Sequence, residues 1–513
     1  MDPAVDSAEP SVSTSTSTAP PPSEPDMIFA RGLRVAIQGC GHGMLDQIYA
    51  TIEQACHVNS YTVDLLIICG DFQATRNSRD LLSMAVPQKY RHMCDFYKYY
   101  NGSKTAPIPT VFVGGNHEAS SHLYELSLGG WVAPNIYYLG NTGVVNINGI
   151  RIAGVSGIYN EGDYRRPRSD RPPYDDRSMR GAYHYRAHEL FKLNMLSGDV
   201  DVFVSHDWPV GITRYGNERW LLSVKRHFQA EVAAGKLGSP PLMGMLRKLR
   251  PRYWFAAHMH VKFAALVDHA APERTEAAND VDAWMSITEG ADAAAPAKNA
   301  DEIDLDMDDE EDTPAAKPVP QEKQPAPVPT TAQESSSSDA GKYPAPATTN
   351  QQTRFLALDK LLPRRDFLQI LTIPSAAPLP ANSPSRTTLR YDREWLAILR
   401  ALEPLDVATG VGLSQYMKFA QDTPRVEKRI REERAWVDEN ISDEQLVIPE
   451  NWEQTAKMQW DDHTKASRPP DLVHNPQTET LCKLLGIENK WTPGLQTRFV
   501  KSPSPAAGPS SGQ

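Results

Sequence analysis

Five short apolar segments, each followed by a polar cluster that contains glycine or histidine, constrain the fold of this chain more than any other feature. The segments are Leu33–Ile37, Leu65–Cys69, Pro109–Val113, Val200–Val204 and Tyr253–Ala257. Runs of this length and composition predict buried β-strands. Helices are predicted between the first three of them, at Met44–Val58 and around Asp80–Tyr100. Strands that alternate with helices predict an α/β fold of one or two layered sheets, with a functional site at the loops that follow the strands.

Composition divides the 513-residue chain into ordered blocks and polar segments. The segment Asp301–Asp312 is strongly acidic and lies within a stretch rich in Ala, Pro and Ser, which predicts disorder. Beyond it, helices are predicted around Asp392–Leu402 and at Arg425–Glu439. We therefore predict a disordered tail at 1–30, a catalytic domain at 31–268, an acidic disordered linker at 269–352, completion of the catalytic domain at 353–405, a helical C-terminal region at 406–495 and a disordered tail at 496–513.

Net charge, cysteine content and the length of apolar runs argue against an overall basic RNA-coating protein, a disulfide-rich protein and a membrane-spanning protein. The net charge of −11 argues against a protein that coats RNA with an overall basic surface, so any contact with nucleic acid must come from a local patch. The five cysteines are odd in number and form no disulfide framework, which favours a reducing compartment. No apolar run reaches the roughly 18 residues of a membrane-spanning helix, and residues 1–26 lack the apolar region of a secretory signal.

The five polar clusters contain side chains that bind metal ions. They are Gly39–Gly43, Gly70–Asp71, Gly114–Glu118, Ser205–Asp207 and Ala257–His260. A single histidine is more often structural than a ligand, but core packing does not explain five such clusters at successive strand ends. Two divalent metals roughly 3.5–4 Å apart can activate water and hold a phosphoryl group. Asp71 is the natural bridging ligand, and His258 and His260 point the same way if their segment is extended.

The order of these clusters resembles the calcineurin-like metallophosphoesterase superfamily, whose pattern is D-x-H, GD, GNH[ED], a lone His and GH-x-H. Here Ala257 precedes the last histidine pair, and Cys40 stands where the superfamily usually has the first Asp. A thiolate is softer than a carboxylate and favours Zn or Fe(II) over Mg or Ca.

The Cys-Gly-His-Gly start is similar to that of the RNA lariat debranching enzymes, in which Cys at this position is common. Other similar segments are Gly157–Tyr164, Pro172–Tyr174, Arg180–Leu196, Ser205–Pro209, Thr353–Gln369, Tyr391–Leu399 and Gln477–Ile487. The resemblance covers about 31–268 and 353–490. It implies an α/β (α+β) fold, in which a two-layer β-sandwich flanked by helices carries a smaller, mainly helical C-terminal region.

The resemblance also implies a role for each residue of the clusters. One metal would be held by Cys40, His42, Asp71 and His260, and the other by Asp71, Asn116, His206 and His258. His117 matches the general acid of the family, which protonates the 2′-oxygen leaving group. Two divalent ions are therefore expected as cofactors, with Fe(II) or Zn(II) favoured and Mn(II) a further candidate.

The segment Gly157–Leu196 is predicted to recognise the branch, because it interleaves aromatic and basic side chains. Bases stack on aromatic rings, and arginine pairs with phosphate. The predicted RNA-binding residues are Tyr159, Tyr164, Arg165, Arg166, Tyr174, Tyr183 and Arg186. Acidic residues dilute the charge of the segment, so a solvated surface loop is the alternative interpretation.

The resulting hypothesis is a hydrolase that cuts the 2′,5′-phosphodiester bond of branched intron lariat RNA and gives linear introns during mRNA processing. This function implies residence in the nucleus, no membrane partner, and contacts between the C-terminal region and spliceosome-associated proteins. Two alternatives stay open. The chain can be a phosphoesterase of the same fold that acts on a phosphoprotein or linear nucleic acid, or a non-catalytic scaffold of that fold.

Overall fold

The computed structural model describes residues 32–270, 348, 350–375, 387–403, 422–457 and 466–492. The predicted N-terminal tail, the tail at 496–513 and nearly all of the acidic linker lie outside these residues, as do parts of the predicted C-terminal region. All five apolar segments contain strands within one residue or two of their predicted bounds. Their backbone groups are satisfied by sheet pairing, which allows these apolar runs to be buried.

The first sheet places three of the predicted strands side by side. Its order is β12 (Leu368–Pro374), β1 (Gly32–Gln38), β2 (Leu65–Ile68), β3 (Thr110–Phe112), β5 (Ile136–Tyr138) and β4 (Gly130–Ala133). Strands β1, β2, β3 and β5 are parallel, with Val35 opposite Leu65 and Leu66 opposite Thr110. The carboxyl ends of β1, β2 and β3 therefore meet at one edge of the sheet.

The second sheet contains the other two predicted strands. Its order is β10 (Phe263–Asp268), β11 (Gln352–Ala357), β9 (Tyr253–Ala256), β8 (Val202–Ser205), β7 (Ile150–Val155), β6 (Thr142–Ile147) and β13 (Leu389–Tyr391). Strands β7, β8, β9 and β11 are parallel, with Val202 opposite Tyr253. The carboxyl ends of β8 and β9 are thus neighbours in this sheet.

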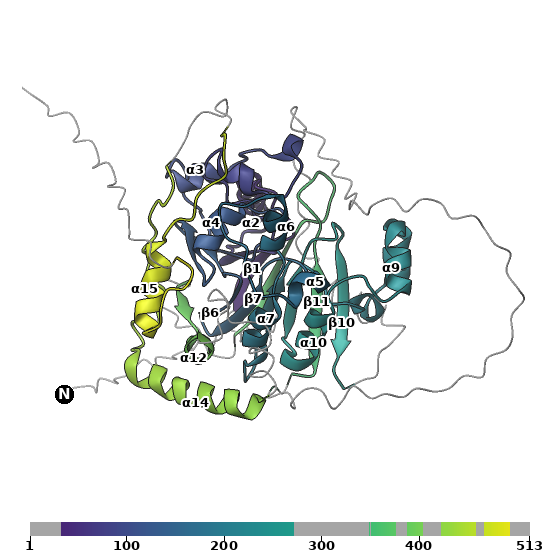
Figure 1. Cartoon of the computed structure of the whole chain (residues 1–513). Coiled ribbons are helices and arrows are strands. Elements are labelled where there is room, and N and C mark those ends of the chain that lie inside the picture. The colour runs from purple at the N-terminus through teal and green to yellow at the C-terminus, as the bar shows by residue number, and fades with distance from the viewer. Residues whose placement is uncertain are drawn as a thin grey trace, which may run out of the picture.

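Apolar side chains from both sheets pack against each other and form the centre of the fold. Val35, Ile67 and Val111 of the first sheet share one buried cluster with Val204 and Phe255 of the second. Each of these side chains is fully buried. Two sheets that pack face to face with helices outside confirm the predicted α/β sandwich (Figure 1).

Helices cover the outer faces of the sandwich (Figure 1). They are α2 (Leu45–Asn59), α3 (Phe96–Tyr100), α4 (Ser120–Glu125), α5 (Glu161–Tyr164), α6 (Asp176–Ala182), α7 (Ala187–Asn194), α8 (Glu218–Val224), α9 (Gln229–Ala233), α10 (Pro240–Leu249), α12 (Arg393–Leu402), α14 (Thr423–Asn440) and α15 (Pro476–Leu485). Short 3₁₀ helices η1 (Asp80–Ser83), η2 (Gln88–Tyr90), η3 (Ile212–Tyr215) and η4 (Arg226–Phe228) join them. None of the helices in the described ranges combines the length and apolar character needed to cross a bilayer.

The single helix predicted around Asp80–Tyr100 is wrong. The segment forms η1, η2 and α3, separated by extended backbone. Pro87 lies just before η2 and lacks the backbone N–H that a continuous helix requires. Cys94 has a φ of 49°, a left-handed conformation that also interrupts a helix.

The part of the chain beyond the linker is built into both sheets. Strand β11 lies between β9 and β10, strand β12 pairs along β1, and β13 pairs with β6. Helix α12 begins after Asp392, whose side chain accepts a hydrogen bond from the Trp395 amide and caps the helix. Further along, the Gln477 amide of α15 bonds to the backbone N–H and carbonyl of Trp131 in β4. Helix α15 therefore rests directly on the first sheet.

Arg76 is a buried arginine that joins the loop after β2 to α4. Its guanidinium contacts Asp80 at 2.8 Å and Glu125 at 2.7 Å, and it donates to the Thr455 hydroxyl. Arg76→Ala leaves two buried carboxylates without their cation, so we expect the free energy of unfolding to fall by about 3–5 kcal/mol. Urea unfolding followed by circular dichroism measures this change.

The control for this experiment is Arg79→Ala, because Arg79 is partly exposed and pairs with the exposed Asp471. Exposed pairs contribute little, so the control should lose less than about 1 kcal/mol. Equal losses in the two variants would contradict a structural role for the buried Arg76 network.

Candidate metal centre

The five polar clusters meet where the carboxyl ends of the parallel strands of the two sheets face each other. Cys40 follows β1, and the backbone of the cysteine pairs with Lys360 in an isolated bridge. Asp71 follows β2, whereas His206 directly follows β8. Clusters that are far apart in sequence therefore supply one site, as the strand order predicts.

Four of the predicted ligands form a compact group on one side of this site. One ligand atom from each of Cys40, His42, Asp71 and His260 lies within 4.8 Å of the other three. The rings of His42 and His260 are 5.6 Å apart. A thiol, two imidazoles and a carboxylate at this spacing form a donor set that suits a divalent transition metal.

Asp71 lies between this group and the remaining predicted ligands. Its Oδ2 is 3.8 Å from His42 Nε2, and its Oδ1 is 3.4 Å from His206 Nε2. Asp71 Oδ1 also accepts a hydrogen bond from the His117 backbone N–H at 2.9 Å. One carboxylate thus faces both halves of the centre, which is the position that a bridging ligand requires.

The second half of the centre contains Asn116, His206 and His258. His206 Nε2 is 3.1 Å from Asn116 Oδ1, and the rings of His206 and His258 are 5.0 Å apart. On the other side of its ring, His206 Nδ1 is 2.8 Å from the Cys69 carbonyl. A carbonyl on Nδ1 holds the proton there and leaves the Nε2 lone pair directed into the site.

His117 lies over Asp71 and beside the first half of the centre. Its Nδ1 is 3.9 Å from Asp71 Oδ2, and its ring is 5.5 Å from that of His42. Two buried imidazole nitrogens, His42 Nε2 and His117 Nδ1, have no hydrogen-bond partner in the described parts of the chain. Buried polar atoms are rarely left unsatisfied, so His42 Nε2 at this position fits a metal ligand.

The backbone of the centre adopts a conformation that L-residues rarely take. His42, Asp71, His258 and His260 all have φ between 43° and 62°. Such conformations cost free energy and are concentrated at functional sites. Glycine allows the close approach of the loops, because a Cβ at Gly115 would lie 2.1 Å from Asp71 Oδ1.

Burial keeps three imidazoles of the centre neutral. It lowers the pKa of His42 to about 4 and that of His258 to about 3, and it also lowers the pKa of His260. Neutral imidazole is the form that binds metals. Burial, followed by the nearby Asp71 carboxylate, raises the pKa of the Cys40 thiol well above its ordinary value. The thiol is therefore protonated at neutral pH without a metal, and metal binding must release this proton.

Glu118 ties the two ligand loops together, a role that the sequence reasoning did not assign. Its carboxylate accepts hydrogen bonds from the backbone N–H groups of Phe72 at 2.7 Å, Gln73 at 2.8 Å and Gly115 at 2.9 Å. Burial, with the nearby Asp71 charge, raises the pKa of Glu118 to about 8. The sequence feature that could have indicated this role is the position of Glu118 directly after Asn116 and His117.

The predicted recognition loop folds around a buried ion pair. Arg168 contacts Glu189 through two hydrogen bonds of 2.7 and 3.0 Å, and Asn141 donates to the same carboxylate. The loop reaches the metal centre through its backbone, since the Tyr159 N–H donates to Asp207 Oδ2 at 3.0 Å.

The predicted RNA-binding residues differ in their exposure. Arg165 and Arg166 are exposed, whereas Tyr159, Tyr164 and Tyr183 are partly buried. Tyr174 and Arg186 are buried, and the Arg186 guanidinium contacts Asp170 at 2.6 Å and the carbonyls of His184 and Gly181. The positions of these last two residues favour support of the loop over direct contact with RNA.

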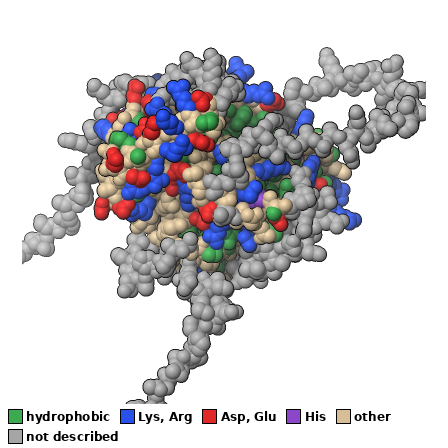
Figure 2. Space-filling model, turned by 90° about the horizontal axis from the view of Figure 1, so that it is seen from below, with side chains coloured by type: hydrophobic (Ala, Val, Ile, Leu, Met, Phe, Trp, Pro, Cys, Tyr) green, Lys and Arg blue, Asp and Glu red, His purple; other side chains and the backbone are tan. Residues whose placement is uncertain are grey.

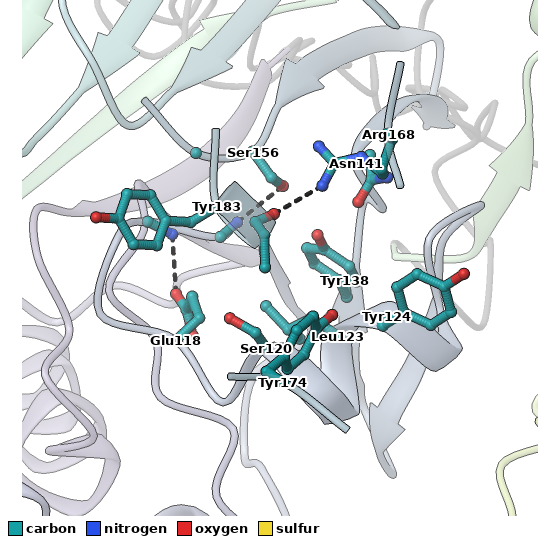
Figure 3. Close-up of a pocket in the computed structure, with 14 residues that line it drawn as sticks. Glu118, Ser120, Leu123, Tyr124, Tyr138, Asn141, Ser156, Arg168, Tyr174 and Tyr183 are labelled. Atoms are coloured by element: carbon teal, nitrogen blue, oxygen red, sulfur yellow. Dashed lines mark hydrogen bonds between the residues drawn. The ribbon is translucent and has the colours of Figure 1, made fainter. Parts of the chain in front are cut away.

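A polar cavity separates the recognition loop from the loop that carries Asn116 and His117 (Figure 3). Tyr124, Tyr138 and Tyr174 line one part of it, and Asn141 and Arg168 line another. The Ser156 hydroxyl accepts a hydrogen bond from the Gly114 N–H at 2.9 Å and donates to the Gly140 carbonyl. The cavity therefore couples the recognition loop to the metal-ligand loop.

Comparison with known proteins agrees with this geometry. Residues 33–262 match the family model described as calcineurin-like phosphoesterase, and residues 350–490 match the model described as lariat debranching enzyme, C-terminal domain. The chain is 46% identical to a lariat debranching enzyme of Drosophila melanogaster over 463 residues, which cover 89% of this chain and 78% of the relative. A lariat debranching enzyme of Homo sapiens is 40% identical over 89% of this chain and 69% of its own length. One of Schizosaccharomyces pombe is 40% identical over 93% of this chain and 99% of its own length.

Proposed function

This chain belongs to the lariat debranching enzyme family, and we propose from this premise that it hydrolyses the 2′,5′-phosphodiester bond at the branch of intron lariat RNA. The observation that carries the proposal is the convergence of the buried ligand set Cys40, His42, Asp71 and His260 beside His117. The products are a linear intron with a free 2′-hydroxyl at the branch nucleotide and a 5′-phosphate on the released end.

Two sets of residues would hold the two metal ions, and Glu118 positions the loops that carry some of them. Cys40, His42, Asp71 and His260 would hold one divalent ion, and Asp71 with Asn116, His206 and His258 would hold the other. When bound, such ions activate water and neutralise charge on the phosphoryl oxygens. Glu118 keeps the Asp71 loop and the Asn116 loop in register through its three backbone hydrogen bonds.

His117 is proposed to donate the proton that the departing 2′-oxygen needs. An alkoxide is a poor leaving group, so protonation of this oxygen lowers the barrier to bond cleavage. The imidazole lies on the metal-ligand loop and is held beside Asp71, with its backbone N–H bonded to that carboxylate. This placement puts an imidazole that can donate a proton beside the ligands of the proposed metal centre.

The ligand chemistry supports a proposal for the identity of the metals. We propose Fe(II) or Zn(II), with Mn(II) as a weaker candidate, because the fully buried Cys40 supplies a soft sulfur donor. Metal analysis of protein purified without added metal would test this proposal. A centre that contains only Mg²⁺ would contradict it.

Two further proposals concern the setting of the enzyme. Introns are released where splicing occurs, which supports residence in the nucleus, and the microscopy of a tagged chain tests it.

Spliceosome-associated proteins are proposed to contact the C-terminal region. Helix α14 there carries basic and acidic side chains that pair, such as Lys428 with Glu432, and basic and acidic side chains are interleaved on part of the lower face of the molecule (Figure 2). Loss of co-purified splicing proteins on replacing these side chains would support the contact.

A cleavage assay tests the debranching function directly. Purified protein is offered a branched RNA and a linear 3′,5′-linked RNA of the same sequence, with Fe(II), Zn(II) or Mn(II) added in turn. Preferential cleavage of the branch is the expected result. Cleavage of the linear RNA alone would favour a phosphoesterase with another substrate, and inactivity with every metal would favour a scaffold.

A further inference from the structure

Helix α8 exposes an apolar face that none of the preceding assignments uses. Trp220 is 43% exposed and Val224 is 52% exposed. They are four residues apart in α8 and therefore lie on the same face of the helix. Among the described residues, the remaining large hydrophobic side chain with comparable exposure is Val58 on α2. A single exposed apolar residue is ordinary, but an exposed tryptophan beside a second apolar side chain is typical of a binding surface.

Basic residues lie next to Trp220 and Val224 in the sequence. Arg219 and Arg226 are exposed, and Lys225 lies between Val224 and Arg226 at the end of the helix. The acidic residue of α8, Glu218, is engaged by the Thr213 hydroxyl at 2.5 Å. The whole chain has a net charge of −11, so this local excess of positive charge is not a general property of the molecule. We call Arg219, Trp220, Val224, Lys225 and Arg226 the α8 surface.

An electrostatic interaction and a backbone pairing link Lys225 of the α8 surface to the segment beside Cys40. Lys225 interacts electrostatically with the Asp359 carboxylate, as do Lys360 and Arg365. Lys360 pairs through its backbone with Cys40, and its charge acts on His42. Lys225 of the α8 surface and Lys360, which adjoins Cys40, therefore act on the same carboxylate.

The recognition loop approaches the centre from the other half. Its Gly157 N–H donates to the Gly114 carbonyl at 2.8 Å, and its Tyr159 N–H donates to Asp207, next to His206. The recognition loop therefore adjoins the His206 half of the centre, whereas Lys225 of the α8 surface acts on Asp359, the neighbour of Lys360. Helix α9, which follows α8, also lies across the molecule from α14 and α15 (Figure 1).

A branched RNA has more strands than one loop can hold, because three chains leave the branch nucleotide. We propose that the α8 surface binds one single-stranded arm of the branched RNA, with a base stacked on Trp220 and phosphates beside Arg219, Lys225 and Arg226. Aromatic rings among cations bind single-stranded nucleic acid in this way without reading its sequence. The inference rests on the proposed debranching function and adds a second RNA-binding surface to it.

Charge complementarity favours RNA over a protein partner on this surface. Three of the five cations of α14 pair with acids, in the contacts of Lys428 with Glu432, Arg429 with Glu433 and Arg434 with Asp438. The α8 surface instead combines the exposed cations Arg219 and Arg226 with the exposed apolar side chains of Trp220 and Val224. A polyanion with flat bases matches this combination of charge and aromatic surface.

The test compares two branched RNAs that share one branch, with arms of about two or about ten nucleotides. The wild-type protein should prefer the long arms. In Trp220→Ala, the ratio of kcat/KM for long over short arms should fall about fivefold or more, which is the lower range for loss of one base stack. Trp220→Phe retains an aromatic ring and should restore most of the ratio. Val58→Ala, at the matched exposed apolar position on α2, should leave the ratio unchanged.

Binding of a linear single-stranded RNA, followed by fluorescence anisotropy over a range of salt concentrations, supplies a second readout. In the double variant Arg219→Ala/Arg226→Ala, the slope of log Kd against log salt concentration should fall by the amount expected for the loss of about two phosphate contacts. Lys428→Ala on α14 should leave this slope unchanged. An unchanged arm-length ratio in Trp220→Ala together with an unchanged salt slope would overturn the proposal and favour a protein partner. If the wild type cleaves neither branched RNA, the debranching function fails, while loss of linear RNA binding in Trp220→Ala would still support the α8 surface.

Discussion

His117→Ala should lower kcat for branch cleavage by about 10²- to 10⁴-fold while the metal content of the protein stays unchanged. The imidazole is placed beside Asp71 by a backbone hydrogen bond and has no assigned role as a ligand. Its removal takes away the proposed proton donor but leaves the seven ligand side chains in place. Single-turnover kinetics on a branched RNA, with metal analysis of the same preparation, measures both quantities.

The leaving group provides a sharper test of the role of His117. A nitrophenyl phosphodiester releases a stable anion that needs no proton. The rate of its hydrolysis should therefore fall much less in His117→Ala than the rate of branch cleavage does. His227→Ala, which alters an exposed histidine away from the ligand loops, is the matched control and should leave both rates unchanged. Equal losses on the two substrates would contradict the general-acid role, because a misplaced substrate or a damaged centre affects both.

The arrangement of the ligand clusters could be predicted because it depends on local patterns. Apolar runs predict strands, and the ends of parallel strands meet at one edge of a sheet. Cys40, Asp71 and His206 were therefore expected to converge, and the structure brings them together. The predicted roles of the individual ligands stay predictions until metals are measured.

The features that could not be predicted depend on long-range packing. Tyr174 and Arg186 belong to the residue types that bind RNA, yet both are buried. The Arg186 guanidinium pairs with Asp170 inside the folded loop. No sequence pattern indicates that β11 inserts between β9 and β10. Glu118 was missed for the same reason, because its partners, Phe72 and Gln73, are more than forty positions away.

The second large effect is expected at Cys40. Cys40→Asp replaces the sulfur with the carboxylate that the wider calcineurin-like superfamily usually has at this position. Hard oxygen ligands favour Mn and Mg over Zn and Fe(II). We expect the affinity for Zn(II) to fall by at least about 100-fold, because loss of a partner that merely orients a ligand already costs 10- to 100-fold. Competition with a chelator of known affinity measures the change.

The dependence of metal binding on pH distinguishes loss of the thiolate from a general disturbance of the site. Burial and the Asp71 charge raise the pKa of the Cys40 thiol, so the metal-free protein carries this proton at neutral pH and must release it on binding. The affinity of the wild type should therefore rise by about tenfold per pH unit between pH 6.5 and 8.

His42 and His258 do not add to this slope. The pKa values of about 4 for His42 and about 3 for His258 keep both rings neutral over the same pH range. In Cys40→Asp the carboxylate is already ionised, so the share of the rise that comes from the Cys40 proton should disappear, while Glu118, with a pKa of about 8, titrates in both proteins. Cys69→Ser changes a buried cysteine that lies just outside the ligand set and should keep the slope of the wild type. A wild type without any rise, or an unchanged slope in Cys40→Asp, would exclude a sulfur ligand at this position.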